Sequence, residues 1–290
     1  MDSISILLLL LSVVLSASRN IFSKGVSKFR FGTKKFFFSQ FSLFLAGSIA
    51  VILVEEIHLA SIVPITAMYA FIYGILLICA QWYYIAALEN SNIAVCSIFY
   101  ALGFIFPTIS GVLFWNETIT YINGFGILCV IPAVVISGLK TPKTKNKVSN
   151  AGYILPLLIS MLSAGGLGIM QIVQQKSLYQ EQRPEFILVG FLLASVVSFI
   201  CFVFAKSDDK NVLDKKYFMS AAAGVCYGGC NLLSTTLAGR LDSAMFFPVY
   251  NIGVILLSTV LSYIIFKEKM QKKDILVFSL GIISIILLNL

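Results

Sequence analysis

The chain alternates between long apolar stretches and short polar connections. Ten such stretches can be marked, with approximate limits 3–22, 36–54, 61–88, 91–115, 119–139, 151–175, 186–205, 217–239, 243–266 and 274–290. Each is long enough to cross about 30 Å of hydrocarbon as a helix. Only helices and closed barrels satisfy their own backbone hydrogen bonds in lipid, and these stretches are too long and too continuously apolar for barrel strands. The pattern predicts an all-α, polytopic membrane protein with ten transmembrane helices.

The composition supports this prediction. Of 290 residues, 59% are hydrophobic and 12% are charged, and the mean hydropathy is +0.94. A soluble domain averages roughly 45–50% apolar and about 25% charged residues. The formal net charge is +8, but the cations fall in short connections rather than on one soluble face. We therefore expect no binding of nucleic acid.

The lysines and arginines lie on alternate connections. Seventeen of the 21 occupy four connections on one side of the membrane, 24–35, 140–147, 206–216 and 267–273. The connections on the other side hold three, Lys176, Arg183 and Arg240. Cytoplasmic loops of membrane proteins carry an excess of lysine and arginine, so the basic connections are predicted to face the cytoplasm. The protein itself is predicted to lie in the cell membrane. With ten spans, both termini are then expected outside.

The chain also repeats itself. At an offset of 151, residues 87–118 lie over residues 238–269, with Ala87, Thr108 and Glu117 matched by identical residues. At an offset of 147, "LSA" recurs, and the polar stretch "KTPKTKNK" separates the two halves. Because five spans are an odd number, the second copy would be inverted relative to the first. We predict a first five-helix repeat over 1–140, a basic cytoplasmic linker over 141–150 and a second repeat over 151–290.

These features resemble the ten-helix, EamA-like branch of the drug/metabolite transporter superfamily. The resemblance rests on ten spans, the half-repeat, "FWNET" at 114–118, "IFKEK" at 265–269, and Gly126. It implies carriage of a small metabolite, such as an amino acid, a sugar, a nucleoside or a drug-like compound. Two departures are visible. Gly103 and Val254 stand where members often carry proline, and members usually have both termini in the cytoplasm, whereas the cation count predicts the opposite.

A carrier needs polar side chains that face a cavity near the middle of the membrane. In the ninth span, Pro248 removes one backbone donor and is followed by Tyr250 and Asn251, so Asn251 is expected to bind a ligand or the carbonyl that the proline leaves free. The repeat brings Tyr100 of the fourth span to the position of Asn251. One helical face of the fourth span holds Tyr100, Gly103, Pro107 and Gly111. This face indicates either a kinked, close-packed helix interface or a cavity wall.

The eighth span contains the sequence "GVCYGGCNLLSTT". Gly224 and Gly228 form a small-xxx-small pair, which is typical of close helix packing. Tyr227 and Asn231 lie between and after them, and Asn231 is the better candidate for a ligand contact.

The third and sixth spans add further candidates. Trp82 and Tyr84 are expected in an interfacial aromatic belt, which leaves Tyr73 and Gln81 as candidates for the cavity. In the sixth span, Gln171 begins a group of glutamines near the membrane boundary. A hydrated, interfacial position is expected for it, with the cavity as the alternative.

The deepest cation is Arg19, beside Asn20. We expect Arg19 to extend toward the basic cytoplasmic side; the alternative is that it binds a carboxylate or phosphate of the substrate, aided by Asn20. The acidic residues all fall in loops, termini or span ends, which disfavours exchange of cationic drugs for protons. Glu117 and Glu268 are expected to cap helix starts, where a carboxylate meets the positive end of a helix dipole.

Together these observations predict a secondary transporter of a small neutral, zwitterionic or anionic metabolite that works by alternating access. The expected cavity lies between spans 1, 3, 4, 6, 8 and 9. Alternatives are a sugar or nucleoside carrier of the same fold, or a membrane scaffold or sensor that does not transport. The single histidine, His58, and the absence of hydrolase motifs argue against an enzyme, and no cofactor or metal is expected. The expected partners are the substrate and the lipid bilayer, with a monomer or homodimer as the oligomeric state.

Overall fold

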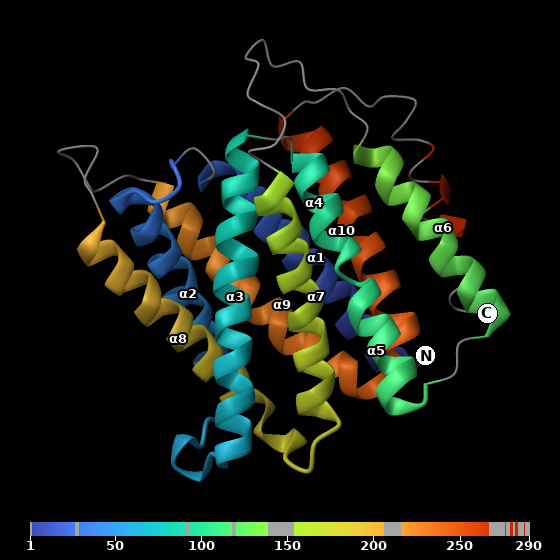
Figure 1. Cartoon of the computed structure of the whole chain (residues 1–290), viewed down its shortest axis with the longest axis horizontal. Helices are drawn as coiled ribbons and strands as arrows, with labels where there is room; N and C mark the ends of the chain where they lie inside the picture. The colour runs from blue at the N-terminus through green and yellow to red at the C-terminus, as the bar shows by residue number, and fades with distance from the viewer. Residues whose placement is uncertain are drawn as a thin grey trace.

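The computed structural model describes residues 2–26, 29–90, 93–117, 120–138, 154–205 and 216–266, with six further positions between 276 and 287. Every regular element in these residues is a helix (Figure 1). The α-helices are α1 (Ser3–Val26), α2 (Lys34–Val54), α3 (Pro64–Asn90), α4 (Ile93–Leu102), α5 (Ile105–Trp115), α6 (Tyr121–Gly138), α7 (Ile154–Gln175), α8 (Arg183–Phe204), α9 (Lys216–Arg240) and α10 (Ser243–Phe266). Two short 3-10 helices, η1 (Leu59–Ser61) and η2 (Gln180–Gln182), lie in connections.

The prediction of an all-α, polytopic membrane protein is confirmed. By length and composition, six of the described helices can cross a membrane, namely α1, α2, α3, α7, α8 and α10. The fourth predicted span is divided into α4 and α5, and α6 and α9 occupy the fifth and eighth. The α9 helix is less apolar than the others because its small and polar residues face neighbouring helices rather than lipid. The tenth predicted span, 274–290, lies outside the described residues apart from isolated positions.

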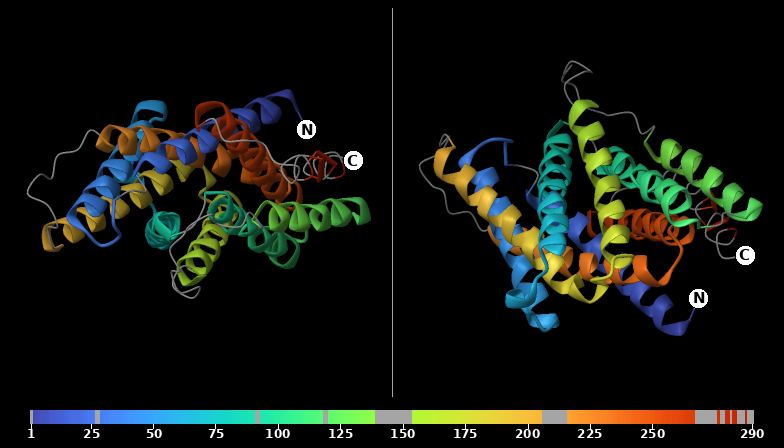
Figure 2. Two further views of the ribbon diagram at one scale, coloured as in Figure 1. Left: turned by 90° about the horizontal axis from the view of Figure 1, so that it is seen from above. Right: turned by 60° about the horizontal axis from the view of Figure 1, so that its bottom comes forward.

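The packing of the first half is repeated with the two halves exchanged. The α1 helix packs on α9, and its counterpart α7 packs on α3. The α2 helix packs on α9, and its counterpart α8 packs on α3. Likewise, α1 contacts α10, and α7 contacts α4 and α5, which together correspond to α10. Figure 2 shows α3 and α7 on one side of the bundle and α1 and α9 on the other. This exchange is the pattern expected for two inverted five-helix repeats; the predicted boundaries at 140 and 151 fall outside the described residues.

The division of the fourth span has a local cause. Pro107 has no N–H, and its ring would overlap the carbonyl four residues earlier, which belongs to Gly103. The helix breaks there: the N–H of Gly103 donates to the Tyr100 carbonyl at 3.2 Å and that of Phe104 to the Ala101 carbonyl at 3.0 Å, each three residues back. In contrast, α10 continues through Pro248. The break gives this span two half-helices whose ends meet in the middle of the bundle.

Glycines let α9 lie directly on the backbone of α2. A Cβ added at Gly224 would lie 2.0 Å from the Leu43 carbonyl oxygen, and one added at Gly228 would lie 2.5 Å from that of Gly47. Neither distance allows a side chain. The close helix packing predicted for this glycine pair is therefore confirmed, and it fixes α9 at the centre of the bundle, where Tyr227 becomes buried.

Candidate substrate cavity

A cavity of about 90 Å³ lies between α1, α3, the α4–α5 break, α7, α9 and α10. These helices are spans 1, 3, 4, 6, 8 and 9 of the sequence analysis. One buried water needs about 10–15 Å³ by the same measure, so the cavity has room for several waters or for a small metabolite. Part of the wall is apolar and includes Phe104, Leu167, Phe247 and Ile255.

Arg19 is the central charge of the cavity. Only 4% of its surface is exposed, and its Nη2 donates to Gln81 Oε1 at 2.9 Å. The guanidinium carbon lies 4.1 Å from the ring centre of Tyr227, 5.1 Å from that of Tyr100 and 5.7 Å from that of Tyr84. The expectation that Arg19 extends to the cytoplasmic surface is wrong. It is wrong because α9 and α10 pack over the inner face of α1 and enclose the side chain.

Among the described residues, Arg19 has no opposite charge beside it. In the described part of the chain no carboxylate pairs with it, and its Nε has no hydrogen-bond partner. Aromatic faces and one amide oxygen stabilise a guanidinium through cation–π attraction and hydrogen bonding. Even so, a buried cation without a counter-ion is costly. The arrangement is therefore suited to a ligand that brings its own negative charge, because a carboxylate or phosphate accepts charge-assisted hydrogen bonds from arginine.

A second polar group, formed by α3, α7 and α9, borders the same cavity. Tyr73 donates from its hydroxyl to Asn231 Oδ1 at 2.6 Å. Gln171 donates from Nε2 to Ser234 Oγ at 3.0 Å and to Asn231 Oδ1 at 3.3 Å. Only 5% of Gln171 is exposed, so its expected interfacial, hydrated position is wrong. Gln171 lies inside the bundle because α7 packs closely on α3 and contacts α9.

The contact between α1 and α10 contributes further polar side chains. The hydroxyls of Ser16 and Tyr250 share a hydrogen bond, and Asn20 donates to Ser258 Oγ at 3.3 Å. Asn251 donates from Nδ2 to the Phe247 carbonyl at 2.8 Å. The carbonyl that Pro248 leaves free belongs to the residue four positions before it, so Asn251 is bonded to a different carbonyl from the expected one.

The structure brings together all ten residues proposed from the sequence. Eight lie on the cavity wall, namely Arg19, Asn20, Tyr100, Gln171, Tyr227, Asn231, Tyr250 and Asn251. The other two, Tyr73 and Gln81, stand directly behind the wall and hold Asn231 and Arg19 through hydrogen bonds. The fourth-span face that included Gly103 and Pro107 is both a broken, close-packed interface and part of the wall.

The sequence analysis missed three wall residues that carry a hydroxyl group: Ser16, Tyr84 and Ser234. The assignment of Tyr84 to an interfacial belt is wrong, since it is 2% exposed and faces Arg19. Each of them lies three positions from a proposed residue: Ser16 from Arg19, Tyr84 from Gln81, and Ser234 from Asn231. Helical spacing therefore carried a signal that could have found them.

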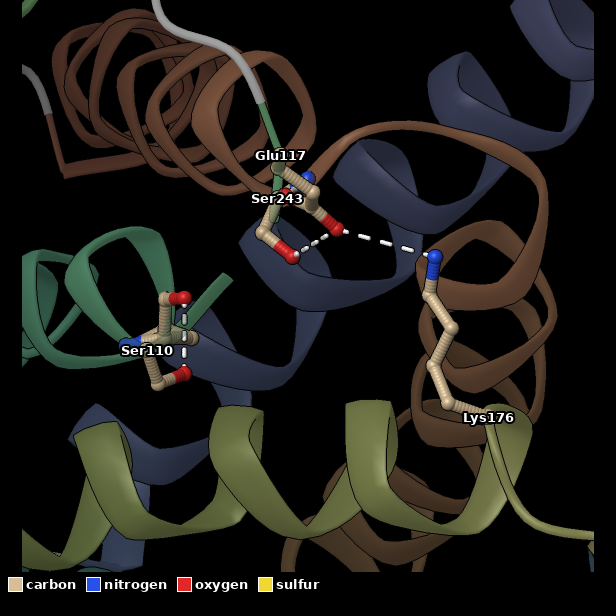
Figure 3. Close-up of polar contacts among 5 residues, drawn as sticks. Ser110, Glu117, Lys176 and Ser243 are labelled. Carbon is tan, nitrogen blue, oxygen red and sulfur yellow. Dashed lines mark hydrogen bonds and ion pairs between the residues drawn. The ribbon is translucent and has the colours of Figure 1, made fainter. Parts of the chain in front are cut away.

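Glu117 joins three helices at one end of the bundle (Figure 3). Its carboxylate accepts from the backbone N–H of Ser243 at 2.7 Å and from the hydroxyl of Ser243 at 3.1 Å, where α10 begins. Lys176, just after α7, places its Nζ 3.7 Å from the same carboxylate. The predicted helix-cap role is confirmed for Glu117, although the helix it caps is α10 rather than the next helix in the chain. Glu268 lies outside the described residues.

Comparisons with known proteins agree with this architecture. Residues 152–290 match the model of the EamA-like transporter family. Residues 152–290, just under half of the chain, are thus similar to the EamA-like transporter family. The predicted resemblance is confirmed, and EamA-like proteins are multi-pass membrane transporters of the drug/metabolite type, not enzymes.

The fold of the whole chain resembles that of a solved structure. The protein of a solved crystal structure superposes on this chain with a TM-score of 0.74, and the match covers 99% of this chain and 96% of that one. The two sequences are 13% identical, so the likeness concerns the fold alone. No curated protein matches the sequence.

Proposed function

We propose that this protein carries small metabolites bearing a carboxylate across the cell membrane by alternating access, and that Arg19 binds the carboxylate. The observation that carries the proposal is a buried guanidinium with no acidic partner in the described residues, facing a cavity between the two halves. A cationic substrate would meet uncompensated repulsion there. A carboxylate would supply the missing charge and occupy donors such as Nε, which has no partner in the described structure.

Alternating access is supported by the position of the cavity. Its wall takes residues from both halves, and the packing of one half repeats that of the other. In carriers built from inverted repeats, rocking one repeat against the other exposes a central site to each side in turn. The excess of cations on alternate connections supports an orientation with these connections in the cytoplasm and the end that contains Glu117 outside.

The experiment measures uptake into proteoliposomes of three matched compounds: leucine, 4-methylpentanoate, which lacks the amino group, and 3-methylbutylamine, which lacks the carboxylate. The same measurements are made with the wider set of small amino acids and their matched acids and amines. We expect uptake of carboxylate-bearing compounds and none of the amines. A charge-assisted hydrogen bond contributes about 1.5–3 kcal/mol, so Arg19→Gln should lower carboxylate uptake roughly 10- to 100-fold.

Arg183→Gln is the matched control, because Arg183 pairs with Glu55 outside the cavity. It should leave the preference for carboxylates unchanged. Asn251→Ala and Tyr100→Ala should lower uptake while the protein still inserts into the membrane. Uptake of the amine at the rate of the acid, or unchanged uptake by Arg19→Gln, would overturn the proposal.

A further inference from the structure

We propose that Gln171 selects, among carboxylates, those that carry a hydrogen-bond donor on the carbon next to the carboxylate. The inference rests on the proposed function, because it assumes that Arg19 binds the carboxylate. It adds a residue for the other end of the substrate and a rule for what that end must be: an ammonium or hydroxyl group, and not a carbonyl.

The argument starts from Asn231, whose amide orientation is fixed by a backbone carbonyl. Asn231 Nδ2 donates to the Tyr227 carbonyl at 2.8 Å, and a carbonyl oxygen can only accept. The other amide atom, Oδ1, therefore points to the opposite side. There it accepts from the Tyr73 hydroxyl and from Gln171.

The orientation of Gln171 follows. Three oxygens surround its Nε2: Ser234 Oγ at 3.0 Å, Asn231 Oδ1 at 3.3 Å and the Tyr73 hydroxyl at 3.4 Å. Ser234 uses its own hydrogen on the Asn231 carbonyl, and Tyr73 uses its hydrogen on Asn231 Oδ1. All three oxygens are thus left as acceptors, and only the NH₂ group of Gln171 can donate to them, with its two hydrogens shared among the three. A reversed amide would place oxygen against Asn231 Oδ1.

The remaining atom, Gln171 Oε1, is an acceptor without a donor. In the described part of the chain no group donates to it, and Gln171 is a wall residue of the cavity. The cavity consequently has two poles of opposite character. Arg19 can only donate, and Gln171 Oε1 can only accept.

The spacing of the poles suits a small substrate. Arg19 contacts the Tyr227 ring, and Gln171 contacts Asn231, one helical turn further along α9. Four residues of helix correspond to a rise of roughly 6 Å. A carboxylate and a donor on the adjacent carbon span this interval when a hydrogen bond of about 3 Å is added at each end. The apolar wall near Leu167 would receive the side chain.

The first test uses the unaltered protein and measures how well three compounds compete with leucine uptake. The compounds are 2-hydroxy-4-methylpentanoate, 4-methylpentanoate and 2-oxo-4-methylpentanoate, which place a donor, no polar group and an acceptor at the same carbon. We expect leucine and the hydroxy acid to bind best and the oxo acid to bind worst, because its oxygen would face Gln171 Oε1. Equal inhibition by the hydroxy acid and the oxo acid would overturn the role of Gln171 while leaving the proposed function intact.

The second test compares Gln171→Met with Gln174→Met. Gln174 lies on the same helix, is fully buried and donates to the Tyr179 carbonyl at 2.8 Å, but it is not a wall residue. Gln171→Met should weaken leucine and hydroxy-acid binding about tenfold, with 4-methylpentanoate unchanged. Gln174→Met should leave the ratios unchanged. An equal loss for all compounds in Gln171→Met would indicate a merely structural role. Binding of 3-methylbutylamine in place of every carboxylate would instead refute the proposed function, and the selectivity with it.

Discussion

Replacing Gly224 by alanine tests whether contact between the α2 and α9 backbones places the cavity wall. An added Cβ would lie 2.0 Å from the Leu43 carbonyl oxygen, whereas ordinary contacts of this kind begin near 3.4 Å. The difference between the two distances, 3.4 − 2.0 Å, means that α9 must move by about 1.4 Å from α2. Overpacking of this kind typically costs about 1–3 kcal/mol. The shift would also displace Tyr227 and Asn231 relative to Arg19 and Gln171.

Gly229→Ala is the matched control on the same helix. A Cβ at Gly229 would meet only the end of the Leu15 side chain, at 3.0 Å, and that side chain can move. Both substitutions gain helix propensity of about 1 kcal/mol, so this contribution cancels in the comparison. Gly224→Ala should therefore be less stable than Gly229→Ala by about 1–3 kcal/mol.

Thermal unfolding in detergent can be followed with a dye that fluoresces on reaction with thiols, because Cys96 and Cys230 are buried in the folded chain. We expect the unfolding midpoint of Gly224→Ala to lie several degrees below that of Gly229→Ala. The uptake of carboxylates should fall in Gly224→Ala and persist in Gly229→Ala. Equal midpoints for the two variants would show that the α2–α9 contact is not as close as described.

Two further predictions concern the end of the bundle at Glu117 and the orientation of the chain. Glu117→Ala should lower the free energy of unfolding by about 1–3 kcal/mol, because the start of α10 loses its hydrogen bonds to the buried carboxylate. Lys176→Met should lower it by less than about 1 kcal/mol, because the ion pair with Glu117 is partly exposed. Chemical denaturation measures both changes, and equal losses of stability would contradict the capping role. A cysteine at Leu178, which is 95% exposed, should react with an impermeant maleimide added to intact cells, and a cysteine at Lys143 should react only after permeabilisation. The reverse labelling would place the basic connections outside.

Much of the fold could be predicted from the sequence because lipid imposes a simple rule. A backbone in hydrocarbon must form helices of a minimum length, so apolar stretches such as 36–54 and 243–266 reveal their state without knowledge of their neighbours. Pro107 breaks its helix because it lacks an N–H, and the glycine pair of α9 allows close helix packing because it lacks side chains. Both effects depend on the residue itself and could therefore be predicted from the sequence. The resemblance to the EamA-like family followed from the same pattern, because the half-repeat and the residues around Glu117 are visible in the chain itself.

The direction in which each polar side chain points was decided only by the tertiary structure. Arg19 and Gln171 lie near span ends in the sequence, where water is the usual partner of a polar group, and both were expected there. Packing of α9 and α10 on α1 encloses Arg19, and packing of α7 on α3 brings Gln171 to Asn231, 60 residues away in the chain. A hydrogen bond between distant segments depends on which faces of the helices meet. Hydropathy along one helix does not contain that information.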